Sequence, residues 1–220
     1  MKRVFFVIAA VVAAVSMMAE PSVRHIDTNG PKGESLFAED ANGFAEYKAV
    51  VPFQVSAEEA LANVEGWAKG LGKSVEVKNP KKEGNIVSFH GKVDINSELS
   101  LFRVMVGDSA RYYAKAESKL SFDCAIEVRE GRLRVVFSNL FSERDGVNSD
   151  FVENEGPVND LYWNHVNGIK QQQAKVRGNA AKFEKALNVE NKLYSIEYQV
   201  IADLAQSLKT SVMSYTEEEW

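Results

Sequence analysis

The sequence has few of the residues that carry common enzyme chemistry. It contains one cysteine, Cys124, and three histidines in 220 residues. A single cysteine excludes an intramolecular disulfide, and His25, His90 and His165 show no zinc-ligand spacing. The sequence has no glycine-rich phosphate loop, no nucleophile elbow and no calcium-loop pattern. We therefore predict no catalytic residue, no cofactor and no metal site, and the sequence identifies no ligand-binding residue.

The chain also lacks an excess of positive charge. Its 26 Lys and Arg stand against 31 Asp and Glu, a formal net charge of −5. Without Lys2 and Arg3, 24 basic residues remain against the same 31 acidic ones, which gives −7. Nucleic acids and anionic membrane surfaces attract proteins with a basic patch. The charge balance therefore disfavours both as partners.

The first 19 residues have the pattern of a secretory signal peptide. Residues 4–15 form an uncharged apolar run behind Lys2 and Arg3, and Ala19 precedes Glu20-Pro21. Such a run is shorter than the roughly 20 residues that span a membrane. No cysteine follows it, which disfavours a lipoprotein anchor. We expect cleavage after Ala19, a secreted or periplasmic protein, and no stable membrane span after cleavage; the alternative is an N-terminal membrane anchor.

The next two segments lead into a folded domain. Residues 20–44 are rich in turn signals, which predicts a flexible or loosely docked leader that contains His25. Alternating apolar residues predict a strand over 45–53. Ser56 and Glu59 then form a capping box ahead of a helix that ends near Leu71. Trp67 lies on the apolar stripe of this helix, which favours a core position over a ligand-stacking role.

Two more strands are expected after the helix. They cover residues 74–78 and 85–95, with a turn at 79–84 and a further apolar segment at 99–106. His90 and Asp94 face the same side of the second strand, but residues four apart on a strand lie about 13 Å apart. They therefore form no acid–base pair by themselves, and we predict that His90 is a solvated surface histidine.

The clearest pattern is a β-hairpin over residues 119–140. Apolar residues alternate on both sides of Glu130-Gly131, which predicts a two-residue turn with Gly131 at positive φ. This register places Cys124 opposite Phe137 on the buried face and Glu127 opposite Arg134 on the solvent face. The lone Cys124 is thus expected in the core and not as a nucleophile. The strand before it is unusually long, so we expect a break or bulge near residues 117–118.

The C-terminal third is predicted to be helical. Gly156-Pro157 is a helix-start signal, and apolar residues then follow heptad-like spacing as far as Leu187. We expect a break at residues 188–191 and a second helix to Val212, so that residues 157–215 form a helical region before an acidic tail at 216–220. His165 is expected to be partly buried near the helical seam.

The order of these elements resembles a family of secreted bacterial domains of unknown function with a fold like the TATA-binding protein. The similarity lies in residues 60–71, in Gly84-Asn85-Ile86 with Phe89-His90-Gly91, and above all in residues 126–134. It covers residues 45–140 and leaves the long C-terminal helices unexplained. The resemblance implies an α+β fold in the order β-α-β-β-β-β-α, with helices on one face of an antiparallel sheet, and it implies no activity.

The fold analogy alone would suggest nucleic acid, but the sequence argues against it. A minor-groove binder needs a basic concave sheet with apolar wedges, and the predicted solvent face is mixed in sign. We therefore expect a noncatalytic exported module at residues 45–156 that binds a protein or small ligand. The alternatives are a structural or assembly subunit that forms homo-oligomers through residues 157–215 and, less favoured, an envelope hydrolase.

Overall fold

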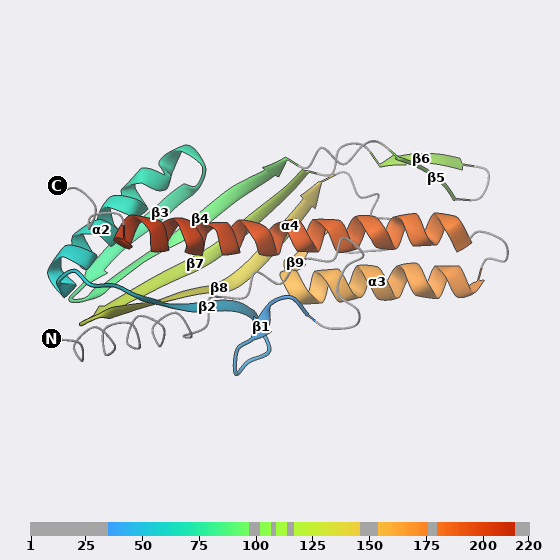
Figure 1. Cartoon of the computed structure of the whole chain (residues 1–220). Helices are drawn as coiled ribbons and strands as arrows, with labels where there is room; N and C mark the ends of the chain where they lie inside the picture. Colours follow the sequence, from blue (N-terminus) through green and yellow to red (C-terminus); the bar gives the residue numbers. More distant parts are fainter. Residues whose placement is uncertain are drawn as a thin grey trace, which may run out of the picture.

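A computed structural model describes residues 35–96, 102–106, 109–113, 117–145, 154–175 and 180–213. The predicted signal peptide and acidic tail lie outside these residues. The fold is α+β, with a long antiparallel sheet and helices on one of its faces (Figure 1). The fold class predicted from the sequence is therefore confirmed.

The main sheet has the strand order β1-β2-β8-β7-β4-β3, with β9 paired to β8. Its strands are β1 (Ala38–Glu39), β2 (Ala45–Pro52), β3 (Glu76–Glu83), β4 (Ile86–Asn96), β7 (Glu117–Arg129), β8 (Arg132–Asp145) and β9 (Glu155–Pro157). A separate two-stranded sheet joins β5 (Phe102–Val106) to β6 (Ser109–Tyr113). The break or bulge expected near residues 117–118 falls where β7 begins.

The β7–β8 hairpin has the predicted register. Cys124 lies opposite Phe137, Glu127 lies opposite Arg134, and Gly131 has φ of 72°. Farther from the turn the register shifts by one residue, because Ser121 pairs with Phe141 whereas Asp123 pairs with Ser138. This β-bulge holds Asn139 at φ of 50°, a conformation that asparagine tolerates better than most residues.

The bulge reverses which side chains of β8 face inward. Before it the buried residues have odd numbers, and after it they have even numbers. The inward set on β8 is Leu133, Val135, Phe137, Leu140, Ser142 and Arg144. Phe141, which simple alternation would bury, is 36% exposed.

The predicted capping box begins helix α2 (Ala57–Gly70). Ser56 Oγ accepts a hydrogen bond from the Glu59 amide at 3.1 Å, and the helix continues into a 3₁₀ turn, η1 (Leu71–Lys73). Trp67 is 8% exposed and its ring lies 6.0 Å from that of Phe89. The prediction that Trp67 is a core residue is confirmed.

The turn predicted at residues 79–84 is wrong. Strand β3 continues through this segment with a register shift between Lys78 and Lys81, and Asn79 has φ of 52°. Because β3 is the edge strand, Pro80 needs no amide hydrogen on its outer side. The actual turn to β4 contains Gly84, at φ of 60°.

The predicted helix boundary at residues 188–191 is also wrong. Helix α3 (Val158–Lys175) ends earlier, and α4 (Ala180–Met213) runs without interruption through that segment. Asn191 is the last residue of the segment in which the break was expected. Its side-chain oxygen instead accepts a hydrogen bond from the Tyr162 hydroxyl at 2.6 Å, so the asparagine joins α3 to α4.

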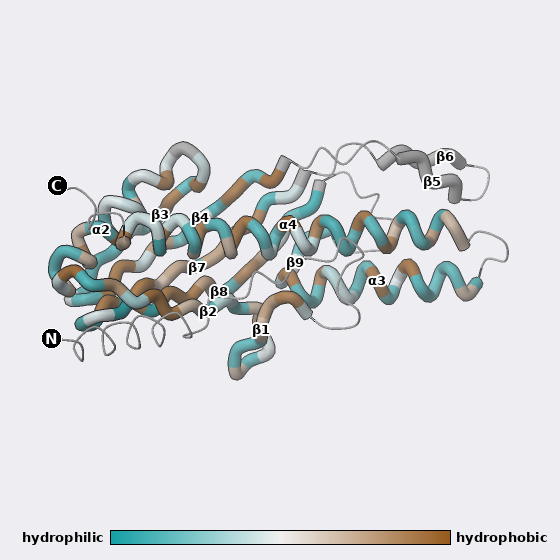
Figure 2. The backbone as a smooth tube through the Cα atoms, in the orientation of Figure 1, coloured by the Kyte–Doolittle hydropathy of each residue, from teal (hydrophilic) through white to brown (hydrophobic). Residues whose placement is uncertain are grey.

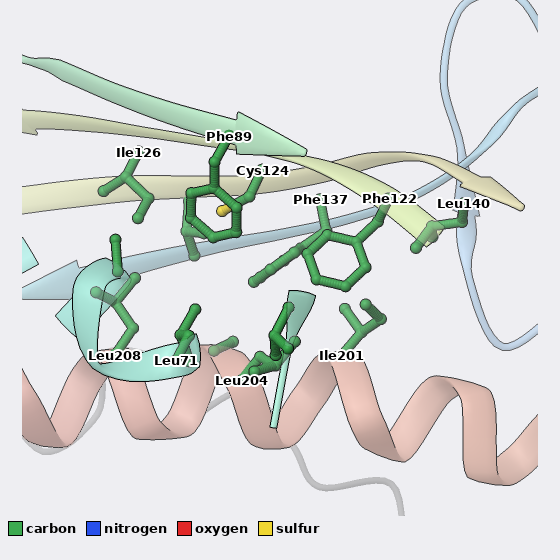
Figure 3. Close-up of a cluster of buried hydrophobic side chains, with 14 of the residues drawn as sticks. Leu71, Phe89, Phe122, Cys124, Ile126, Phe137, Leu140, Ile201, Leu204 and Leu208 are labelled. Carbon is green, nitrogen blue, oxygen red and sulfur yellow. The ribbon is translucent and has the colours of Figure 1, made fainter. Parts of the chain in front are cut away.

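The hydrophobic core lies between the sheet and the helices α2 and α4. Phe122 and Phe137 project from the sheet toward Ile201 and Leu204 of α4 (Figure 3), and their rings are 5.4 Å apart. The core thus crosses the division that the sequence suggested between residues 45–156 and the C-terminal helices. It also includes Phe37, which is 2% exposed and belongs to the segment expected to be a leader.

Figure 2 shows that the two ends of the molecule differ in hydropathy. The strands near α2 carry long hydrophobic stretches, whereas the portions of α3 and α4 that extend past the sheet are mainly hydrophilic. No described helix is long and apolar enough to cross a membrane.

Candidate functional site

The open face of the sheet carries a small cluster of polar side chains. His90 on β4 lies directly opposite Asp123 on β7, and its Nδ1 is 3.0 Å from Asp123 Oδ1. Asn139 Nδ2 donates to the other Asp123 oxygen at 2.6 Å. The His90 side chain is 40% exposed, so it is accessible to solvent but bonded to Asp123. The sequence pattern placed Asp94 on the same side of the strand as His90 but gave no sign of Asp123, because pairing across strands requires the β4–β7 register.

This cluster has the parts of an acid–base pair. Burial acts to raise the pKa of Asp123, but hydrogen bonds from Asn139 and His90 outweigh it and lower that pKa. Among the described residues no group of three His, Cys, Asp or Glu could hold a metal ion. The pair lies on an exposed sheet face, and Asp123 is held as the charged partner of its neighbours.

A second polar cluster is buried between the sheet, α3 and α4. Arg144 on β8 is 1% exposed and forms ion pairs with Glu190 at 2.6 Å and Glu197 at 3.0 Å, both on α4. Ser142 donates to Glu197 at 2.6 Å, and Ser118 donates to it at 3.1 Å. These contacts join strands β7 and β8 to α4 through charged hydrogen bonds.

His165 of α3 completes this buried cluster. It is 2% exposed, and its Nδ1 is 3.0 Å from Glu190 Oε2. Burial opposes ionisation of Glu190, but Arg144 and His165 outweigh it and lower its pKa. Burial also acts to lower the pKa of Arg144, and Glu197 and Glu190 outweigh it and raise that pKa. The sequence predicted partial burial of His165 but did not identify these partners.

Two tyrosines, Tyr162 and Tyr194, continue this buried polar cluster toward residues 35–37. The rings of Tyr162 and Tyr194 stack at 4.2 Å, with 10° between their planes. Tyr194 donates to Asn159 Oδ1 at 2.5 Å and accepts from the Leu36 amide at 3.0 Å. Burial is the main reason that the pKa of Tyr194 rises to about 12. This layer is closed to solvent and fastens α3, α4 and residues 35–37 together.

A groove of about 760 Å³ lies between α2 and α4 on the helical side of the sheet. Trp67 lines it, and the indole Nε1 donates to Ser207 Oγ at 2.9 Å. Asn63 Nδ2 is buried and has no hydrogen-bond partner in the described part of the chain. Other residues that line the groove are Ala62, Gly66, Gly70, Val200, Asp203 and Ser211. The groove therefore combines an apolar wall with a few polar side chains, among them Asn63 and Asp203.

Cys124 contributes no reactive group. Its side chain lies in the core beneath the hairpin and forms no disulfide. Burial raises the pKa of its thiol well above the ordinary value, so the nucleophilic thiolate is suppressed. The prediction that Cys124 fills the core is confirmed.

Comparison of the sequence with family models and with curated proteins finds no match. Among solved structures, the chain is similar to a TBP-like protein from Parabacteroides distasonis, at 16% identity and a TM-score of 0.43, over 78% of this chain and 97% of that one. It is also similar to a DUF4468 family protein from Bacteroides ovatus, at 10% identity and a TM-score of 0.45, over 86% and 96% of the two chains. A TBP-like protein and a family of unknown function are the two terms of the resemblance that the element order and residues 60–71, 84–91 and 126–134 suggested.

Proposed function

We propose that this protein is an exported, noncatalytic binding module and that its small-ligand site is the groove between α2 and α4. The observation that carries the proposal is a groove of about 760 Å³ whose lining joins Trp67 and other apolar residues to the polar residues Asn63 and Asp203. Ligand sites of several hundred Å³ typically combine apolar walls with a few polar groups. A partly apolar small ligand with a few polar groups fits this combination.

Gly66 provides a direct way to block the groove. A Cβ placed on Gly66 meets no atom within 4 Å, so a larger side chain there enters open space. Gly72 is equally unobstructed but does not line the groove. Gly66→Leu is therefore the blocking variant, and Gly72→Leu is its matched control.

The test uses the fluorescent probe 1-anilinonaphthalene-8-sulfonate, which binds apolar pockets. We expect the unaltered protein and Gly72→Leu to bind the probe alike, and Gly66→Leu to lose at least about tenfold in affinity, equivalent to about 1.4 kcal/mol. Equal probe binding by all three proteins would show that the groove is not the site. Thermal unfolding of each variant establishes that the fold is retained.

The proposed export rests on the signal-peptide pattern of residues 1–19. N-terminal sequencing of the protein from the cell-envelope fraction should begin at Glu20. A chain that begins at Met1, recovered from the cytoplasm, would contradict export while leaving the groove experiment unaffected.

The second candidate function is assembly through the helical hairpin of α3 and α4. The hairpin extends past the end of the main sheet (Figure 1), and Ile169, Phe183 and Leu187 on it are only partly buried. Sedimentation of the unaltered protein and of Phe183→Lys tests this function. Assembly predicts an oligomer that the substitution dissociates, whereas a monomer in both samples excludes it.

A further inference from the structure

A second cavity lies on the opposite face of the sheet from the α2–α4 groove. It has a volume of about 240 Å³ and is lined by Val50, Glu127, Arg129, Arg132, Leu133 and Arg134. Three strands build it near the β7–β8 turn. In register, Arg129 lies opposite Arg132, and Arg134 lies between Glu127 on β7 and Val50 on β2. The two-residue turn at Gly131 is what brings three arginines to one place.

The charge of this cavity is opposite in sign to that of the whole chain. Three guanidinium groups and one carboxylate give it a local charge of +2, whereas the chain carries −5. A cleft lined by positive charge raises the local concentration of small anions, whereas the net negative charge of the chain disfavours long polyanions such as nucleic acid. The planar fork of arginine also matches the oxygen geometry of phosphate and carboxylate groups.

Glu127 orients two of the three arginines. Its carboxylate accepts from Arg129 Nε at 2.8 Å and from Arg134 Nη2 at 3.0 Å. Hydrogen bonding from Arg129, more than the opposing effect of burial, lowers the pKa of Glu127, and Arg134 lowers it further. Arg132 has no hydrogen bond or ion pair with the described residues, so its donors are available.

The cavity also has an apolar wall. Val50 is 60% exposed, which is unusual for a large aliphatic side chain at the centre of a strand. It lies beside Arg134, so an anion held by the arginines would place its organic part against Val50. The volume of about 240 Å³ limits that part to a group about as large as one ring.

We propose that this cavity binds a small organic phosphate monoester. Two observations select this class: the local charge of +2 matches the charge of about −2 on a phosphate monoester at neutral pH, and Val50 provides a surface for the esterified group. The site is separate from the α2–α4 groove, so it does not depend on the proposed function.

Isothermal titration with phenyl phosphate tests the proposal on the full mature chain. Arg132→Gln removes the available guanidinium and should weaken binding at least about tenfold, as expected for loss of a charge-assisted hydrogen bond. Lys185→Gln removes one exposed positive charge from α4, far from the cavity, and should change affinity less than twofold. Far-UV circular dichroism verifies that each variant is folded.

Glu127→Gln provides a test in the opposite direction. It raises the local charge to +3 and releases Arg129 and Arg134, so phenyl phosphate should bind severalfold more tightly. Equal affinity of the unaltered protein, Arg132→Gln and Lys185→Gln would overturn the proposal. So would tighter binding of benzoate than of phenyl phosphate, because benzoate keeps the ring but carries a monoanionic carboxylate.

Discussion

The two halves of helix α4 cover the same sheet with different chemistry. Glu190, Glu197 and Leu204 follow one another at intervals of seven residues and therefore lie on one helical face. The carboxylates of Glu190 and Glu197 form ion pairs with Arg144, whereas Leu204 packs in the hydrophobic core. The helix carries carboxylates where the sheet presents Arg144, and it carries apolar residues where the sheet presents an apolar surface.

The difference shows that burial alone does not define the core of this protein. Below the C-terminal half of α4, the sheet presents phenylalanine and branched aliphatic residues (Figure 3). Beyond the bulge at Asn139 it presents Ser118, Ser142 and Arg144, all nearly inaccessible. The carboxylates of α4 are thus matched to a polar patch that the strand geometry creates. Four predictions test this comparison.

The largest effect is expected from Arg144→Met. It leaves Glu190 and Glu197 buried without their cation, which should cost about 3–5 kcal/mol of unfolding free energy. Urea denaturation at pH 7 measures the loss. Adding Glu190→Leu and Glu197→Leu removes the unpaired charges and should recover much of it. A neutral effect of Arg144→Met alone would contradict the role assigned to the ion pairs.

In the apolar half, Leu208→Ala should cost about 3 kcal/mol because it opens a cavity beneath a fully buried position. The matched control on the same helix is Met213→Ala, since Met213 is 49% exposed. The control should change stability by less than about 0.5 kcal/mol. Equal losses in the two variants would indicate that this half of α4 does not pack on the sheet as described.

The bulge itself is tested by two substitutions at Asn139. Valine at φ of 50° is strained, whereas glycine is not. Both remove the hydrogen bond to Asp123, so the difference between them reports the backbone conformation. Asn139→Val should be less stable than Asn139→Gly by about 1–2 kcal/mol in urea denaturation. The reverse order would place Asn139 in an ordinary strand conformation.

The smallest effect concerns pH. The folded protein lowers the pKa of Glu190 below its ordinary value of 4.5, so the ionised carboxylate stabilises the fold above that pH. This contribution is lost as the pH falls through the lowered folded-state pKa. Urea midpoints measured between pH 6 and pH 3 should fall less steeply for Glu190→Gln than for the unaltered protein. Parallel pH profiles would indicate that Glu190 is not ionised in the fold.

Local patterns predicted much of the sheet and of α2. The hairpin register followed from alternation around Gly131, and the start of α2 followed from Ser56 and Glu59, because neighbouring residues determine both. The sequence did not predict that α4 continues through Asn191, because asparagine is typical of helix ends. In the fold its side chain accepts a hydrogen bond from Tyr162. Tertiary partners of this kind leave no local signal.

The polar sites were missed for a related reason. His90 and Asp123 are 33 residues apart in the chain and meet only through strand pairing. Arg144 has the outward parity of Arg132 and Arg134 if alternation is continued along β8, and only the bulge turns it inward. The arginine cavity was predicted only in part. The sequence placed Glu127 and Arg134 on the solvent face, but the contribution of Val50 depends on the β2–β8 register.

Strand β8 consists of two segments, joined at Asn139, in which opposite parities face the core. If the bulge were lost while Asn139 was kept, regular alternation would turn Leu140 and Arg144 outward and Phe141 and Glu143 inward. Deleting Asn139 would instead restore regular pairing and leave Leu140 and Arg144 facing inward. The bulge at Asn139 thus accommodates one extra residue of β8 and keeps the buried residues on both sides of it facing the core.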